Sequence, residues 1–308
     1  MRPRHAWTAR ELVVLGTAAQ SPTPARNQTA HVLRWGNELV LFDPGEGAQR
    51  QLACAGISVA QLTRICITHA HGDHCLGLPG VLQRRSLDPE PAPIDVFVPS
   101  SMTVHVDAML SSSAWDRDLL DVRVHALGGP AVVDLRDGMT LHARPLDHTI
   151  DALGWRIESA PARHFAPERL AALGIVGDDI GRLRRDGVLA HHDGVVRLED
   201  VSVVEAGPAF AFVMDTRPCA SAVALARGVD LLVVESTYLE AEAALAAAHG
   251  HCTARQAATI AAQAGARRLV LAHYSERYPH EEPFAEEART VFAEVVAARD
   301  LDVVPVPS

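Results

Sequence analysis

The amino-acid sequence predicts an α/β fold in which two β-sheets pack together and helices cover their outer faces. Short apolar or β-branched segments alternate with helically spaced segments in both halves of the chain. The chain has 308 residues, 48% of them hydrophobic, so it can bury a sizeable core. A histidine-rich stretch begins where one of the apolar segments ends. We therefore expect two sheets and a candidate site at the edge of one of them.

The first half of the chain contains a series of predicted strands. They are apolar or β-branched and are separated by turn residues or helical patterns. Gly36 and Asn37 form a tight turn between two of these segments. Helices are expected over 46–56 and in the run that ends at Trp115. The expected strands are 11–16, 31–35, 38–43, 64–68, 94–99, 122–127, 140–148 and 153–159.

The second half repeats this style. Strands are expected at 209–215, 229–236, 267–273 and 301–307. Helices are expected between them, at 221–228, 239–248, 253–264 and 284–298. We expect antiparallel pairing within the sheets.

Residues 160–200 interrupt this alternation. The segment is charged, glycine-rich and weakly apolar, and only 167–174 is predicted to be helical. It is either a surface insertion or a functional, flexible segment. We describe the chain as one domain, 1–308, with 160–200 as a flexible substrate-binding arm.

The composition narrows the class of protein. The net charge is −10 and there is no lysine, so any nucleic-acid-binding surface must be local and built from arginine. Five scattered cysteines without a CxxC pair indicate reduced thiols, which predicts a cytoplasmic protein. The sequence has no apolar run long enough to span a membrane and no signal-peptide core at its N-terminus.

The stretch HAHGDH, residues 69–74, contains three histidines and an aspartate within six positions. Imidazole nitrogen and carboxylate oxygen are ligands that suit zinc. One metal cannot easily take all four donors at this spacing, whereas two neighbouring metals can, as in phosphoester hydrolysis. The alternative is a set of surface or helix-capping histidines. The density of donors favours a dinuclear metal site.

This stretch resembles the signature of the metallo-β-lactamase superfamily, whose fold is an αβ/βα sandwich. Further blocks are similar, in order, to those of the ribonuclease Z family of tRNA 3′-processing endonucleases. That resemblance implies a sandwich with a protruding arm insertion, and residues 160–200 occupy the place of that arm. The similar blocks are LGTAAQSPTPARNQTA, LFDPGEGAQRQL, LDHTIDALGWRIE, AFVMDTRPC, VVESTY with HGHCTARQAA, and LVLAHYSERY.

The resemblance also implies roles for individual residues. One Zn²⁺ would be held by His69, His71 and His148. A second Zn²⁺ would be held by Asp73, His74 and His273, and Asp215 would bridge the two ions. Asp43 would buttress the metal-binding histidines. His148, Asp215 and His273 each end an apolar run, so the residues themselves also place them at a sheet edge.

The chemistry expected of this set is phosphodiester hydrolysis. Asp73 is the candidate to accept a proton from the attacking water. His251 would protonate the departing 3′-oxygen, and Glu235 would orient His251. The alternative for Glu235 is a carboxylate that caps the end of a strand.

The function implied by the resemblance is zinc-dependent removal of the 3′ trailer from precursor tRNA by a homodimer. The tRNA would keep a 3′-hydroxyl, and the trailer would carry a 5′-phosphate. Arg182, Arg184 and Arg185 of the insertion are the candidates for gripping tRNA. Two alternatives remain: a metallo-β-lactamase-fold hydrolase acting on a small phosphodiester, and a binding module in which the metal is only structural.

Overall fold

A computed structural model describes residues 10–192 and 194–307, so residues 1–9, which include part of the N-terminal segment discussed above, lie outside it. Contacts within the chain divide it into two compact units. The larger unit contains residues up to 133, 141–157 and the chain from 209 onward. The smaller unit contains 134–140 and 158–208. That 160–200 serves as a substrate-binding arm stays a prediction.

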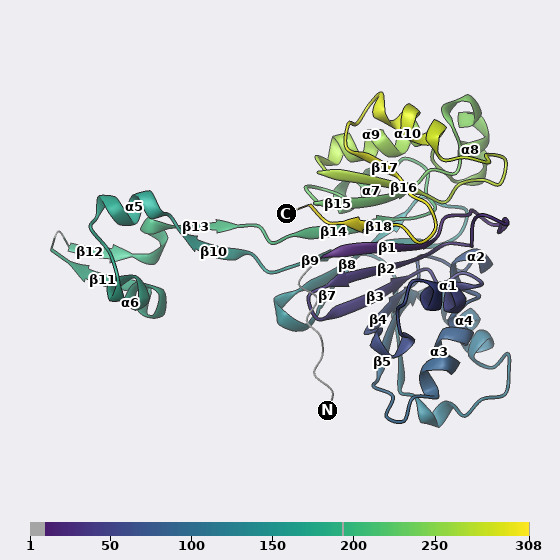
Figure 1. Cartoon of the computed structure of the whole chain (residues 1–308), viewed down its shortest axis with the longest axis horizontal. Coiled ribbons are helices and arrows are strands. Elements are labelled where there is room, and N and C mark those ends of the chain that lie inside the picture. The colour runs from purple at the N-terminus through teal and green to yellow at the C-terminus, as the bar shows by residue number, and fades with distance from the viewer. Residues whose placement is uncertain (1–9, 193, 308) are drawn as a thin grey trace. The chain divides into compact units, whose positions relative to one another are not determined.

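Two seven-stranded sheets form the framework, which confirms the predicted fold class (Figure 1). Both sheets are mixed, so the expectation of antiparallel pairing was wrong for β3 to β6 and for β14 to β17, which pair in parallel. Long connections, most of them with helices, separate these strands, and parallel pairing needs such crossovers. The first sheet has the order β18 (Val303–Pro305), β1 (Glu11–Gly16), β2 (Ala30–Trp35), β3 (Glu38–Phe42), β4 (Arg64–Cys66), β5 (Ile94–Pro99) and β6 (Val122–Leu127). The second has the order β17 (Val295–Ala297), β16 (Arg268–Ala272), β15 (Leu231–Glu235), β14 (Ala209–Val213), β9 (Ala152–Glu158), β8 (Thr140–Leu146) and β7 (Ala131–Asp134).

Aromatic side chains join the inner faces of the two sheets. The Phe42 ring of β3 stacks on Phe212 of β14 with centroids 4.8 Å apart, and Phe210 lies 5.5 Å from the same ring. Helices cover the outer faces (Figure 1). The first sheet carries α1 (Ala48–Cys54), α2 (Gly72–Cys75), α3 (Leu78–Ser86) and α4 (Thr103–Leu110). The second carries α7 (Ala220–Leu225), α9 (Ala254–Ala264) and α10 (Glu282–Arg289), and α8 (Ala243–His249) precedes α9 in the chain. No helix in the described residues could cross a bilayer.

The helix expected over 284–298 was partly wrong. It ends at Arg289, and Val295–Ala297 forms β17, which pairs in parallel with β16. The β-branched Val295 and Val296 fit a strand, and pairing with the edge of the sheet outweighs weak helical spacing.

The smaller unit is more ordered than its sequence indicated, so the prediction of a single helix was wrong. It contains α5 (Pro167–Ala172), α6 (Asp178–Asp186) and two strand pairs, β10 (Ala162–Phe165) with β13 (Ser202–Glu205) and β11 (Val188–His191) with β12 (Gly194–Arg197). Acidic residues in the first turn of α6 and arginines in its last turn match the helix dipole. A small apolar core holds the unit together and comprises Leu170, Ile175, Leu183, Leu189, Val196 and Val201.

Candidate metal centre

The predicted site residues lie where strands of the larger unit end. The parallel strands β14, β15 and β16 place Asp215, Glu235 and His273 at one edge of the second sheet. Asp215 and His273 adopt positive φ angles of 56° and 63°. Residues other than glycine rarely adopt this conformation, and such strain is concentrated at functional sites. The chain thus turns abruptly as each strand ends and presents these side chains at the edge.

The structure brings together all seven predicted metal ligands. His69, His71, His148 and Asp215 form one group of donor atoms that lie within 4.8 Å of one another. Asp73, His74 and His273 form a second group of the same kind. Oδ2 of Asp215 lies 3.6 Å from Nε2 of His69 and 3.4 Å from Nε2 of His74. Asp215 therefore stands between the two groups, as a bridging carboxylate would.

The donor atoms themselves fit a metal. Nε2 of His74, Nε2 of His273 and Oδ1 of Asp215 are buried and make no hydrogen bond. Leaving buried polar atoms unpaired is costly, and a cation among them would remove that cost. The nitrogen and carboxylate donors are those of zinc sites. The residues present therefore fit a pair of zinc-like cations.

Four of the five predicted metal-binding imidazoles have their Nδ1 atom held by a neighbouring group, whereas Nδ1 of His71 lies 2.9 Å from Nε2 of His69. Nδ1 of His74 lies 2.9 Å from Oδ2 of Asp43, and Nδ1 of His148 lies 2.9 Å from the carbonyl oxygen of Gly250. Hydroxyl groups serve the other two, with Thr68 Oγ1 3.0 Å from His69 Nδ1 and Thr237 Oγ1 2.9 Å from His273 Nδ1. Such partners orient metal-binding histidines and fix their tautomers. The sequence indicated Asp43, but not the two threonines.

Asp43 holds two parts of the His-rich turn together. Its carboxylate accepts hydrogen bonds from the backbone N–H and the hydroxyl of Thr68, at 2.6 and 2.7 Å, besides its contact with His74. Burial raises the pKa of Asp43, and the neighbouring His74 opposes this effect. The residue thus buttresses the turn that carries the donors.

Asp73 is held by the opening loop. The backbone N–H of Gln20 donates a 2.8 Å hydrogen bond to Asp73 Oδ2, and Gln20 itself has a positive φ of 47°. Burial would raise the pKa of Asp73, but His74 and His273 beside it hold that pKa well below its usual range. Asp73 therefore stays ionised at neutral pH.

Glu235 and His251 form a hydrogen-bonded pair. Nδ1 of His251 lies 2.9 Å from Oε1 of Glu235, which is fully buried. Burial disfavours charge on His251, but Glu235 and Asp215 outweigh it and raise its pKa to about 9. Glu235 also accepts hydrogen bonds from the backbone N–H groups of Thr216 and Thr237, at 3.0 and 3.1 Å. It therefore caps backbone at the strand end, as the alternative supposed, and also holds His251.

These residues open on a cavity of about 600 Å³. Its walls include Asp73, His148, Asp215, His251 and His273. They also include residues that the sequence analysis did not select, namely Gln20, Gln28, Tyr238, Glu276 and Arg277. Tyr238 and Arg277 lie inside the quoted blocks VVESTY and LVLAHYSERY, so their proximity to predicted site residues was the available signal.

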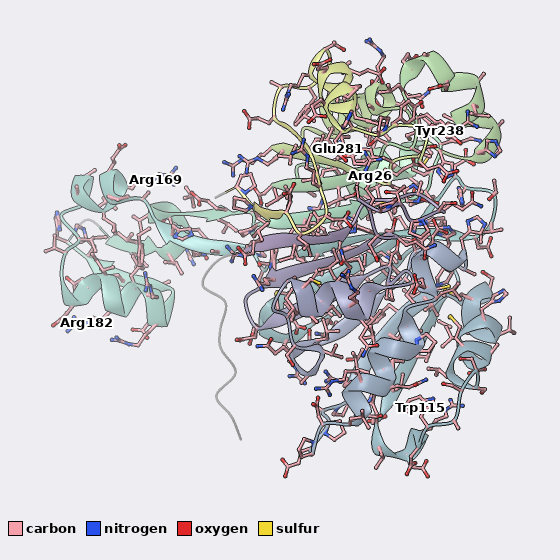
Figure 2. All side chains as sticks on the ribbon, turned by 45° about the vertical axis from the view of Figure 1, so that its right-hand side comes forward. Arg26, Trp115, Arg169, Arg182, Tyr238 and Glu281 are labelled. Atoms are coloured by element: carbon pink, nitrogen blue, oxygen red, sulfur yellow. The ribbon has the colours of Figure 1, made fainter. Side chains whose placement is uncertain are left out.

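The three predicted tRNA-gripping arginines lie elsewhere. Arg182, Arg184 and Arg185 are exposed residues of α6 in the smaller unit, and none of them lines the cavity. Figure 2 labels Arg182 on this helix. Arg182 pairs with Asp179 at 3.3 Å, and the Arg184 guanidinium lies over the Phe165 ring at 5.1 Å. Both are exposed, and the ion pair of Arg182 leaves it accessible to a phosphate because a surface ion pair of this kind is weak.

Comparisons with known proteins agree with this geometry. Residues 38–274 match a family model described as a beta-lactamase superfamily domain. Ribonuclease Z of Nocardia farcinica is 48% identical over 97% of this chain and 98% of its own length. Ribonuclease Z of Streptomyces coelicolor is also 48% identical, over 97% of this chain and 99% of its own length. The crystal structure of the short form of human tRNase Z superposes on this chain with a TM-score of 0.69 and 25% sequence identity. The superposition covers 97% of this chain and 100% of the human chain.

Proposed function

This chain belongs to the ribonuclease Z family of the metallo-β-lactamase superfamily, and from that membership we propose that it removes the 3′ trailer from precursor tRNA. As a member of the family it is a hydrolytic endonuclease. We propose that its cut leaves a 3′-hydroxyl on the tRNA and a 5′-phosphate on the trailer. The observation that carries the proposal is 48% identity to ribonuclease Z over nearly the whole chain, together with a full set of clustered donors.

The proposal assigns two Zn²⁺ ions to each chain. His69, His71 and His148 would hold one ion, Asp73, His74 and His273 would hold the other, and Asp215 would contact both. When bound, such ions lower the pKa of a water molecule and stabilise negative charge on phosphate oxygens. The remaining steps belong to side chains of this protein.

Asp73 and His251 would move the protons of the reaction. The Gln20 N–H holds the carboxylate of Asp73 in place, and Asp73 would accept a proton from the attacking water. His251 can donate a proton to the departing 3′-oxygen, since Glu235 fixes its Nδ1 and favours its charged form. Glu235 acts only through His251.

Binding of the tRNA body would fall to α6 of the smaller unit. The exposed arginines of α6 would contact backbone phosphates far from the cut, because guanidinium groups make forked contacts with phosphate. Family membership also supports action as a homodimer, and the unpaired cysteines support action in the cytoplasm.

The test compares two substrates. Purified, zinc-loaded protein is assayed with a precursor tRNA that carries a 3′ trailer and with a nitrophenyl phosphodiester. The proposal expects a far higher kcat/KM for the tRNA. A higher kcat/KM for the small ester would instead support the alternative, a hydrolase of small phosphodiesters.

A further inference from the structure

The cavity at the metal-type donors has a wall that the proposed chemistry does not use. Its volume, about 600 Å³, exceeds what one phosphate group needs. On this wall lie Tyr238 and Glu276 with Arg277, next to His251 and His273. The backbone of a nucleic-acid substrate extends on both sides of the cut. This wall can therefore contact nucleotides next to the cut.

Arg277 is available to bind an anion. It follows β16, is exposed, and is the single arginine among the described residues that line the cavity. Its guanidinium makes no hydrogen bond or ion pair with the described part of the chain. Its backbone N–H contacts Ser275 Oγ at 3.4 Å. Because the chain has no lysine, Arg277 supplies the fixed positive charge of this wall.

Arg26, the nearby arginine of the opening loop, is committed to the fold. Its Nε and Nη2 atoms donate to Glu281 Oε1 at 2.8 and 2.6 Å, and Nη1 donates to the Tyr278 carbonyl at 2.7 Å. The guanidinium also lies over the Tyr274 ring, and the residue is only 5% exposed. Figure 2 shows Arg26 and Glu281 side by side. The opening loop therefore does not offer this charge to a substrate.

Tyr238 adds a hydroxyl group beside the proposed proton donor. Its ring centroid lies 6.2 Å from that of His251, and backbone hydrogen bonds to Cys252 and Ala254 fix its position. The phenol oxygen makes no hydrogen bond with the described residues. Tyr238 and Arg277 line the same cavity. Burial raises the pKa of Tyr238, and the charge of Arg277 opposes that effect. The phenol thus stays protonated and can donate.

We propose that Tyr238 and Arg277 form a subsite for the last nucleotide that stays on the tRNA, with both side chains donating to its 5′ phosphodiester. The assignment of the side rests on His251, because the departing 3′-oxygen belongs to this nucleotide and must face the proton donor. It also rests on the proposed function. The carboxylate of Glu276 lines the same wall and repels phosphate, which directs the backbone toward Arg277.

The test measures binding of the two products separately. The probes are a tRNA that ends at the cut and a 5′-phosphorylated trailer oligonucleotide, each titrated over a salt series against metal-loaded protein. Arg277→Ala should weaken tRNA binding by about tenfold or more, the range for a charged hydrogen bond. It should also reduce the logarithmic salt slope by about 0.7, the value for one single-strand phosphate contact. Tyr238→Phe should weaken tRNA binding by roughly two- to tenfold.

The control is Arg227→Ala, which removes an exposed arginine before β15, at the opposite end of that strand from Glu235. It should leave both affinities and the salt slope unchanged. Metal content, measured for every variant, should equal that of the parent protein. Trailer binding by Arg277→Ala should stay unchanged, since the trailer lies on the other side of the cut.

Two results overturn the subsite alone. One is an unchanged tRNA affinity and salt slope in Arg277→Ala while the parent protein cuts precursor tRNA. The other is an equal loss for the trailer oligonucleotide, which would place these residues on the wrong side of the cut. A parent protein that does not cut precursor tRNA contradicts the proposed function, and that result is read from a different assay.

Discussion

Oε1 of the buried Glu235 lies 2.9 Å from Nδ1 of His251, at the end of the strand next to those that carry Asp215 and His273. The contact occupies one ring nitrogen of His251 and leaves Nε2 without a partner among the described residues. A carboxylate on one side of an imidazole orients it and stabilises its protonated form. This arrangement is the basis of the proposal that His251 delivers a proton beside the metal-type donors.

His251→Ala should remove proton donation but spare metal binding. With precursor tRNA we expect a rate loss of roughly two to four decades, the usual range for a general acid. The loss should be much smaller with a nitrophenyl phosphodiester, because an activated leaving group needs no proton. Zinc analysis should still find the parent content. Equal losses on the two substrates would mean that His251 has a structural or metal-binding role.

Asp215→Ala should lower both metal content and activity, because Asp215 stands between the two donor groups. His69→Ala should do the same through the first group alone. Elemental analysis of purified protein is expected to find about two zinc ions per parent chain and fewer in each variant. An Asp215→Ala protein that is fully loaded and active would refute the assignment.

Metal removal should destabilise the fold. Without a cation, Nε2 of His74 and of His273 stay buried and unpaired, and a ligand that binds only the folded state raises the thermal midpoint. A chelator should therefore lower the Tm of the parent protein, and added zinc should restore it. In Asp215→Ala the response should be smaller. A parent Tm that does not respond to chelator would contradict a buried metal centre.

Replacing Arg182, Arg184 and Arg185 together with alanine tests the arm. If α6 grips the tRNA body, binding of precursor tRNA should weaken and its salt slope should fall by roughly 0.9 per lost contact with duplex phosphate. The controls change acidic residues of the same helix. Replacing Asp178 and Asp186 with asparagine, or Asp186→Asn alone, should not weaken binding. Unchanged processing by the triple variant across a salt series would show that α6 is not the grip.

Local patterns were enough to predict the framework and the four donors of HAHGDH, whereas the ligand roles of His148, Asp215 and His273 came from the family resemblance. The apolar segments gave the strands, and HAHGDH gave four donors through spacing alone. The parallel pairing of the strands was not predicted because it depends on how the connections cross the sheet. Strand β17 was not predicted because it forms by pairing with β16. The supporting contacts of Thr68 and Thr237, and the cavity positions of Tyr238 and Arg277, arise only when distant segments meet.

The central claim, that this chain cuts the 3′ trailer from precursor tRNA, is tested most directly by mapping the cut. A precursor tRNA with a 3′ trailer is incubated with zinc-loaded protein, and both product ends are sequenced and chemically identified. The account predicts one main cut at the tRNA–trailer junction, a 3′-hydroxyl on the tRNA, a 5′-phosphate on the trailer, and no cut with Asp215→Ala. Scattered cuts, opposite end groups, or intact precursor with fully loaded protein would contradict it.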